Sequence, residues 1–231
     1  MNPKLNELLD QLPDFDYQNL LPHLQLITLV EGTQLYGPGD DIDKIIFPVT
    51  ALLAISVILA DGCCIDTATI GFDGLLGLRG LDAGTSAHRF YVASSGLAYQ
   101  INRNDLLLQA QCGPAIYKMC MQAGIQMIRK MTVEVACANF HTLEQRLSKW
   151  ILIRYHRFKT STIHASHQTI ADSLGVRREA ITHTLRKLSG ISCSRCTIGI
   201  QNPALLQQSC CECYLTQRDA HPSQMTLPLF V

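Results

Sequence analysis

The segment from Ser166 to Leu188 constrains the fold of this chain more than any other stretch. Its apolar residues recur at helical spacing on both sides of Gly175, and glycine readily adopts the positive φ angle that ends a helix. The inner-face positions are Ile170 and Leu174 before the glycine and Ile181, Leu185 and Leu188 after it. The pattern predicts two short helices joined by a tight turn, with Ser166 capping the first helix. This is a helix-turn-helix.

Polar side chains of the second predicted helix point away from this inner face. They are Arg177, Arg178, Glu179, Thr182, His183 and Arg186. The major groove of DNA admits an α-helix, and arginine, glutamate and histidine can hydrogen-bond to base edges. DNA recognition is therefore our hypothesis. An ordinary helical hairpin with a solvated charged face is the alternative.

Charge is segregated along a chain whose formal net charge is zero. Residues 139–198 hold ten Lys/Arg and three Asp/Glu, whereas residues 1–138 hold eight Lys/Arg and fourteen Asp/Glu. A basic segment that carries the motif, joined to an acidic segment, is typical of a polyanion-binding module fused to another domain. A merely solvated surface does not predict this segregation.

The first hundred residues carry short apolar or β-branched runs separated by turn residues such as Asp61 and Gly62. Leucines at positions 5, 8, 9 and 12 predict a short opening helix. We expect strands at residues 25–30, 44–48, 51–59, 63–69, 89–93 and 97–101. Strands of this length and spacing indicate an antiparallel barrel or sandwich.

A long apolar stripe begins after Pro114, where side chains recur every three or four residues as far as Ala138. The stripe predicts a helix of about 25 residues, or about 37 Å. Such a helix is either a lone core helix or half of a two-chain coiled coil. We predict a symmetric homodimer whose seam comprises Ile116, Cys120, Ala123, Met127, Met131 and Val135.

Two further patterns complete the C-terminal half. Thr142 and Gln145 form a capping box that starts a new helix. A short strand is expected at residues 162–165, and the turn-and-strand sequence of residues 190–200 suits a small β-wing. These elements predict a winged helix-turn-helix.

With these motifs the chain resembles the cyclic-AMP receptor protein/FNR (Crp/Fnr) superfamily of bacterial transcription regulators over roughly residues 5–215. The matching landmarks are Gly37-Pro-Gly-Asp40, Phe47-Pro48, Asp61-Gly62, Gly71-Phe-Asp-Gly-Leu-Leu-Gly77, Leu143-Glu-Gln-Arg-Leu147 and Leu174-Gly-Val-Arg-Arg-Glu179. The resemblance implies an α+β fold. Its expected parts are an effector-type, cyclic-nucleotide-binding-like β-roll of the jelly-roll type (1–113), a dimerisation helix and hinge (114–141), a winged helix-turn-helix DNA-binding domain (142–215) and a loose tail (216–231).

The resemblance also implies how the chain acts. A homodimer would bind a palindromic operator in double-stranded DNA, RNA polymerase would be a partner, and the location would be cytoplasmic. We expect Arg178, Glu179 and His183 to read bases, because they lie near the N-terminal end of the second motif helix. The residues expected to hold the DNA backbone are Ser166, His167, Gln168, Arg177, Thr182 and Lys187.

In nucleotide-binding members of this superfamily, a short set of residues holds the cyclic nucleotide. The corresponding residues here, which we call the effector cassette, are Gly74, Leu75, His88 and Arg89, and they depart from the pattern of those members. Those members carry a Glu after the glycine that corresponds to Gly74, and an Arg before two small residues. Leu75 and His88 occupy these positions here, and the bulky Arg89 and Phe90 follow. A cyclic phosphate needs a fixed cation and a ribose hydroxyl needs an acceptor, so we expect no cyclic-nucleotide cofactor. The effector is left unidentified.

The ten cysteines are scattered, and the opening residues lack the apolar core of a secretory signal. We therefore expect reduced thiols and no bound metal. Cys193-x-x-Cys196 nevertheless has the spacing of a metal or redox pair, and Cys210, Cys211 and Cys213 follow it. A thiol- or metal-responsive regulator that uses Cys193, Cys196, Cys210 and Cys213 is the alternative function.

Enzymatic and membrane functions find no support in the sequence. We find no nucleophile elbow, zinc-protease motif, phosphate-binding loop or paired metal carboxylates. The apolar run at residues 45–60 is interrupted by Pro48 and is shorter than the roughly 20 residues of a membrane span. We expect no catalytic activity and no membrane partner.

Overall fold

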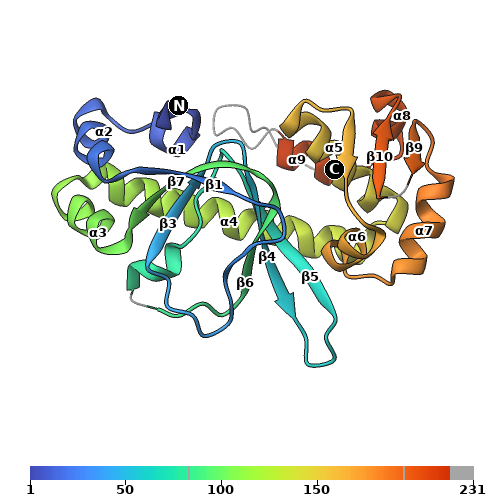
Figure 1. Ribbon diagram of the computed structural model, residues 1–231, viewed down its shortest axis with the longest axis horizontal. Coiled ribbons are helices and arrows are strands. Elements are labelled where there is room, and N and C mark those ends of the chain that lie inside the picture. The colour runs from blue at the N-terminus through green and yellow to red at the C-terminus, as the bar shows by residue number, and fades with distance from the viewer. Residues whose placement is uncertain (83, 195, 219–231) are drawn as a thin grey trace, which may run out of the picture. The chain divides into compact units, whose positions relative to one another are not determined.

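The computed structural model describes residues 1–82, 84–194 and 196–218, and the chain divides into two compact units (Figure 1). Unit 1 comprises residues 1–131, and unit 2 begins at residue 132. The division falls within the long helix α4 (Pro114–Phe140). Most of the expected tail, from residue 219 onward, lies outside the described residues. Across the described part of the chain, every helix lacks either the length or the apolar content needed to cross a bilayer.

Two antiparallel sheets form the centre of unit 1, one ordered β1-β7-β3 and the other β2-β6-β4-β5. Their strands are β1 (Gln25–Leu29), β2 (Gln34–Tyr36), β3 (Lys44–Pro48), β4 (Leu52–Ile58), β5 (Cys64–Ile70), β6 (Arg89–Ser94) and β7 (Gly96–Asn102). Each of the six expected strands forms within one residue of its expected bounds. Strand β2 was not predicted; it is only three residues long and pairs irregularly with β6.

Strand β3 shows why the apolar runs are continuous. Ile45 and Phe47 face one hydrophobic cluster, whereas Ile46 between them faces the other. Successive side chains of a strand point to opposite faces, so a strand with apolar packing on both faces carries no polar alternation. The residue pairs Ile45–Ile101 and Phe47–Tyr99 fix the register of β3 against β7.

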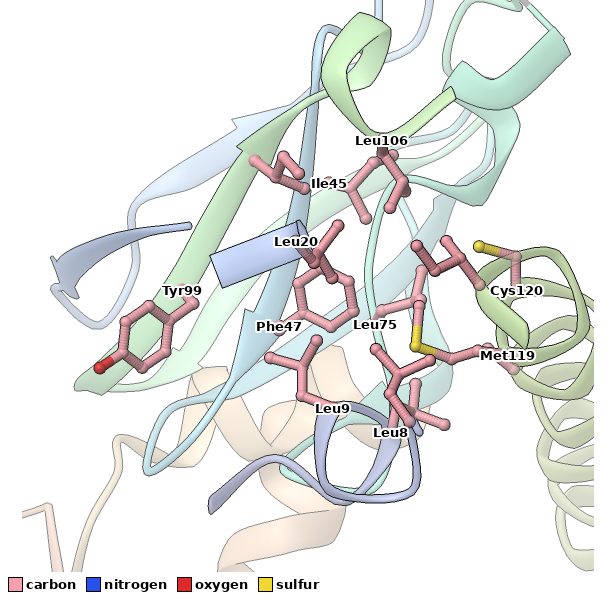
Figure 2. Packing of buried hydrophobic residues seen from close by; sticks show 14 of the residues in the cluster. Leu8, Leu9, Leu20, Ile45, Phe47, Leu75, Tyr99, Leu106, Met119 and Cys120 are labelled. Atoms are coloured by element: carbon pink, nitrogen blue, oxygen red, sulfur yellow. The ribbon is translucent and has the colours of Figure 1, made fainter. Parts of the chain in front are cut away.

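Helices and 3₁₀ turns surround the cluster that contains Ile45 and Phe47, which we call the first cluster of unit 1. They are the 3₁₀ turns η1 (Pro3–Leu5), η2 (Leu21–His23) and η3 (Leu78–Asp82) and the helices α1 (Glu7–Asp10), α2 (Asp14–Leu20) and α3 (Arg103–Cys112). Figure 2 shows Leu8 and Leu9 of α1 directed at Phe47 and Leu75, with Met119 of α4 beside them. The opening helix is shorter than expected, and α2 and α3 were missed. The three leucines of α3 are consecutive and give no helical spacing.

The buried Asn6 ties α1 to the loops around the sheets. Its side-chain amide donates to the carbonyl oxygens of Pro48 at 2.8 Å and Gly74 at 3.0 Å. Its side-chain oxygen accepts from the backbone N–H of Leu8, which caps α1. A fully buried amide is tolerated here because both ends of it are hydrogen-bonded.

Most residues of the expected dimer seam on helix α4 face the interior of unit 1. Ile116, Cys120 and Ala123 are buried in the first cluster of unit 1, and Met127 and Met131 pack against the second. Ile116, Cys120 and Ala123 are therefore buried within their own chain, whereas Met127 and Met131 are only partly buried. The predicted apolar stripe is present, but its periodicity does not show whether it packs against its own chain or against a second one.

The opposite face of α4 is apolar and exposed. Tyr117, Met121, Ile125, Ile128 and Val135 have 51 to 67 % of their surface accessible. Val135 is the one residue of the expected seam that lies on this face. From Met121 to Val135, the positions 121, 125, 128, 132 and 135 alternate in steps of four and three, which is the spacing of a coiled-coil seam, and Thr132 is the polar residue among them.

Unit 2 contains a helical core and a three-stranded antiparallel sheet ordered β8-β10-β9. Its elements after α4 are α5 (Leu143–Phe158), β8 (Thr162–His164), α6 (His167–Leu174), α7 (Arg178–Lys187), β9 (Ile191–Ser194), β10 (Thr197–Ile200), α8 (Pro203–Gln208) and α9 (Cys213–Arg218). Inner-face residues Ile170, Ile181 and Leu185 join Leu147 and Trp150 of α5 in one cluster. The expected winged helix-turn-helix is confirmed.

The capping box at the start of α5 is also confirmed, and it supports a stability prediction. Thr142 Oγ1 accepts from the backbone N–H of Gln145, whose side-chain oxygen accepts from the N–H of Thr142. Thr142→Ala removes one of these bonds and is expected to lower the free energy of unfolding of unit 2 by about 1 kcal/mol. Urea denaturation measures the loss. The exposed Ser189→Ala is the matched control, and an equal loss there would contradict the cap's role.

Candidate DNA interface

The turn between α6 and α7 has the geometry that the sequence predicted. Ser166 Oγ accepts from the backbone N–H of Thr169 at 3.0 Å and caps α6. Gly175 has a φ of 64°, and its N–H donates to the carbonyl oxygens at the end of α6. A residue with a Cβ is strained in this left-handed conformation, so glycine sets the angle at which α7 leaves the turn.

Helix α7 presents the three residues expected to read bases on its outer side. Arg178, Glu179 and His183 are exposed, whereas Ile181 and Leu185 on the other side are buried. Arg178 and Glu179 occupy the first turn, and His183 lies one turn further along the same face. A charged outer face on a helix fixed from behind is the arrangement that major-groove docking requires.

The residues expected to hold the DNA backbone fall into two groups. Gln168, Arg177 and Lys187 are exposed. His167 and Thr182 are half-buried and lie 2.8 Å apart, Nδ1 to Oγ1, and the Thr182 hydroxyl also donates to the Arg178 carbonyl at 3.2 Å. This pair links the start of α6 to the middle of α7. Ser166, the remaining member of the set, is engaged as the cap.

A groove of about 240 Å³ separates α7 from the wing formed by β9 and β10. Arg186, His167 and Thr197 line it together with Cys193 and Cys196. Arg186 was absent from the set of expected contacts, although it lies three residues after His183 and is exposed. Its position beside the groove adds a cation next to the outer face of α7.

Helix α5 braces the motif from behind. The indole N–H of Trp150 donates to Ser173 Oγ at 3.1 Å, and the Arg154 guanidinium lies 3.5 Å from the centre of the Trp150 ring. Arg146 donates to the carbonyl oxygen of Leu174, the last residue of α6. Because these contacts fix α6, they also fix the direction of α7.

In unit 1, Gly74 and Leu75 of the effector cassette are both buried. Leu75 is 1 % exposed and packs among Phe47 and Met119 (Figure 2). The Gly74 carbonyl is engaged by Asn6. An apolar side chain buried at this position offers no acceptor to a ribose hydroxyl.

The other two cassette residues lie at the start of β6. The backbone N–H and carbonyl of His88 both hydrogen-bond the Ser86 hydroxyl. The Arg89 guanidinium lies over the Tyr91 ring, 4.5 Å from its centre, and the Tyr91 hydroxyl donates to the Asp66 carboxylate at 2.9 Å. A carboxylate on this face opposes the binding of a phosphate beside Arg89.

The cysteine set expected as a metal alternative is corrected by the structure. Within the described residues, four potential metal ligands converge, and they are Cys137, His141, Cys211 and Cys213. Only Cys213 belongs to the expected set. Cys193 and Cys196 are exposed on the wing, and desolvation by neighbouring atoms raises the pKa of the Cys193 thiol. Neither thiol of the wing belongs to the converging group.

Comparison with known proteins identifies the C-terminal unit. The sequence model of the Crp-like helix-turn-helix domain matches residues 145–209, which contain α6, α7 and the wing. The chain therefore contains a Crp-like helix-turn-helix domain. This match confirms the resemblance over residues 145–209. No match was found among curated protein sequences.

Solved structures resemble this chain over most of its length. A protein from Eubacterium rectale assigned to the Crp/Fnr family is 15% identical, with a TM-score of 0.72 over 89% of this chain and 98% of that one. The c-di-GMP-responsive global regulator CLP of Xanthomonas campestris is 15% identical, with a TM-score of 0.68 over 82% and 100%. The CRP-family regulator TTHB099 of Thermus thermophilus is 14% identical, with a TM-score of 0.69 over 79% and 95%. At these identities the likeness shows the fold.

Proposed function

We propose that the protein is a transcription regulator of the Crp/Fnr type that binds a palindromic operator sequence-specifically as a homodimer, with α7 of each copy in a major groove. The observation that carries this proposal is the outer face of α7, where Arg178, Glu179 and His183 are exposed on a helix held by buried Ile181 and Leu185. Arg178 donates two hydrogen bonds to a guanine, and Glu179 accepts from a cytosine amino group. Contacts of this kind distinguish base pairs, whereas phosphate contacts set the position of the protein.

The exposed face of α4 is the proposed dimer contact. Its apolar positions from Tyr117 to Val135 extend over about 27 Å at the rise of an α-helix. Pairing two copies about a twofold axis removes both faces from water at once. Two α7 helices related by that axis then address two half-sites about 10–10.5 base pairs apart, centre to centre.

Arg178→Ala tests the proposed function. The change is expected to cost roughly 1–3 kcal/mol of operator binding and to relax the preference at one base pair in each half-site. Lys187→Ala is the matched control: loss of a phosphate contact weakens binding to all sequences alike and lowers the salt dependence. Competition against a randomised operator library measures both effects. A uniform loss for Arg178→Ala, with its base preferences intact, would show that α7 does not read the sequence through this residue.

Cyclic nucleotides are not the proposed effector. Buried Leu75 offers no ribose acceptor, and Arg89 is engaged with Tyr91 near the carboxylate of Asp66. Saturating cyclic AMP or cyclic GMP is therefore expected to leave operator affinity unchanged. Titration calorimetry checks this directly, and micromolar binding of either nucleotide would contradict the assignment. The same calorimetry on Arg89→Ala would then show whether that cation holds the phosphate.

The remaining parts of the proposal follow from DNA binding by a regulator of this type. Its partners are double-stranded DNA, a second copy of the chain and RNA polymerase, and its place of action is the cytoplasm, where bacterial DNA lies. It acts by binding and not by catalysis. The match to a Crp-like helix-turn-helix domain supports DNA as a partner.

A further inference from the structure

Four potential metal ligands from separate parts of the sequence meet in unit 2. Cys137 lies near the end of α4 and His141 directly after it, whereas Cys213 begins α9 and Cys211 lies two residues before it. The three thiol sulfurs and a nitrogen of His141 all lie within 4.8 Å of one another. Cys137 and His141 are four residues apart, and the helical hydrogen bond from the His141 N–H to the Cys137 carbonyl keeps both side chains on one side. We propose that these residues bind one Zn²⁺ ion.

The distances between the ligand atoms fit a single tetrahedral ion. The Cys137 and Cys211 sulfurs are 3.6 Å apart, and the Cys213 sulfur is 3.6 Å from His141 Nδ1. Zinc bonds of about 2.3 Å to sulfur and 2.0–2.1 Å to nitrogen give tetrahedral edges of about 3.8 Å and 3.5 Å, respectively. Two edges of the group therefore match a zinc tetrahedron, and all four ligand atoms lie within 4.8 Å of one another.

The histidine is oriented as a zinc ligand. Its Nε2 lies 3.2 Å from a carboxylate oxygen of Glu212, and its Nδ1 faces Cys213. When Nε2–H donates to Glu212, Nδ1 of the neutral ring carries the lone pair that a metal needs. A carboxylate behind the histidine is the usual outer partner of a zinc-bound imidazole. Packing of small thiols in a core does not account for this orientation.

The surroundings distinguish zinc from other occupants. Cys137, Cys211 and Cys213 are at most 7 % exposed, so four protein ligands enclose the ion, as in a structural zinc site. An iron–sulfur cluster spreads its four ligands over two or four irons and needs some ligand atoms further apart than a single ion does. The buried Lys149 ammonium contacts Cys137 as well as Glu134, which offsets the negative charge of three thiolates on Zn²⁺.

The proposed ion would fasten α9 to the corner between α4 and α5. Helix α9 packs against α5, and α5 braces the α6–α7 motif. The role is structural, because all four coordination positions are filled by the protein. The inference concerns metal content and does not depend on the proposed function.

Metal analysis of the full-length protein tests the site. Protein purified under reducing conditions without a metal-affinity step is expected to hold about one Zn²⁺ per chain. Cys137→Ser and Cys213→Ser are expected to lose it, whereas Cys193→Ser and Cys196→Ser on the wing keep it. Wild-type protein without zinc, protein that carries iron and sulfide instead, or zinc retained by Cys137→Ser would each overturn the proposal.

Two further measurements cover variants that fail to fold. Exchange of Co²⁺ into the folded wild-type protein is expected to give the sulfur-to-metal charge-transfer and ligand-field bands of a tetrahedral thiolate site, and octahedral spectra would contradict it. Glu212→Gln is expected to weaken zinc binding about 10–100-fold, since it disturbs only the partner of His141. Glu144→Gln is the exposed control in the same unit. Equal zinc affinity of the Glu212→Gln and Glu144→Gln variants would contradict the role assigned to Glu212.

Operator binding measured on the same samples separates the two proposals. If the protein contains zinc but does not bind DNA sequence-specifically, the metal site is supported and the proposed function is rejected. If zinc-free wild-type protein binds its operator, the proposed function is supported and the metal site is rejected. A Cys137–Cys211 disulfide found in place of zinc under reducing purification would also reject the metal site.

Discussion

Ile128→Glu is expected to convert the proposed dimer to a monomer. Ile128 lies in the middle of the exposed apolar face of α4 and is 67 % accessible in the single chain. In a symmetric seam each substituted copy contributes a carboxylate, so two like charges meet in an apolar contact. Burying an unpaired charge costs about 3 kcal/mol or more. The dimer dissociation constant and the operator affinity are therefore expected to worsen by roughly 100-fold or more.

Sedimentation and operator binding measure these effects. Gln122→Glu is the matched control, because Gln122 is exposed on α4 but lies to the side of the apolar face. It is expected to remain dimeric. A dimeric Ile128→Glu protein with unchanged operator affinity would mean that the dimer forms elsewhere or that the protein acts as a monomer.

Trp150→Ala is expected to destabilise unit 2 by about 3–5 kcal/mol. The indole is 5 % exposed in the core behind the helix-turn-helix, donates to Ser173 and carries the Arg154 guanidinium on its ring. Its removal leaves a cavity, takes the partner from the Ser173 hydroxyl and exposes the guanidinium to a void. Operator binding is expected to fall with the folded fraction.

Hydrogen exchange resolved along the chain measures this loss in each unit. Amides of α5, α6 and α7 are expected to lose protection, whereas the strands of unit 1 keep theirs, because the two units have separate cores. Trp150→Phe is the control and is expected to lose less, since it retains an aromatic ring. Uniform loss of protection across both units would show that they unfold as one.

The elements defined by local chemistry were predictable from the sequence. The turn at Gly175 needs a positive φ, the cap at Thr142 needs a hydroxyl three residues before Gln145, and the strands of unit 1 have turn residues at both ends. Each of these signals lies within a few residues, so no tertiary contact is needed to detect it. The outer face of α7 followed from the same periodicity.

The errors concern surfaces that only the tertiary fold decides. The stripe through Ile116, Cys120 and Ala123 marked a buried face correctly but assigned it to a second chain, because both partners offer apolar surface. The spacing of Cys193 and Cys196 suggested a metal pair on the wing, whereas the potential ligands that converge come from residues 137 and 141 and from residues 211 and 213. Potential ligands about seventy residues apart are hard to recognise in a sequence, because each pair gives only a short pattern, here Cys-x-x-x-His and Cys-x-Cys.

Selection of binding sites by the wild-type protein from random duplex DNA at physiological salt tests the central claim most directly. The proposed dimer predicts an enriched palindrome whose half-sites lie about 10–10.5 base pairs apart, centre to centre, with one strongly preferred G·C pair in each half-site opposite Arg178. Enrichment of a single unrepeated half-site, or of no sequence at all, would contradict recognition of an operator by a homodimer through α7.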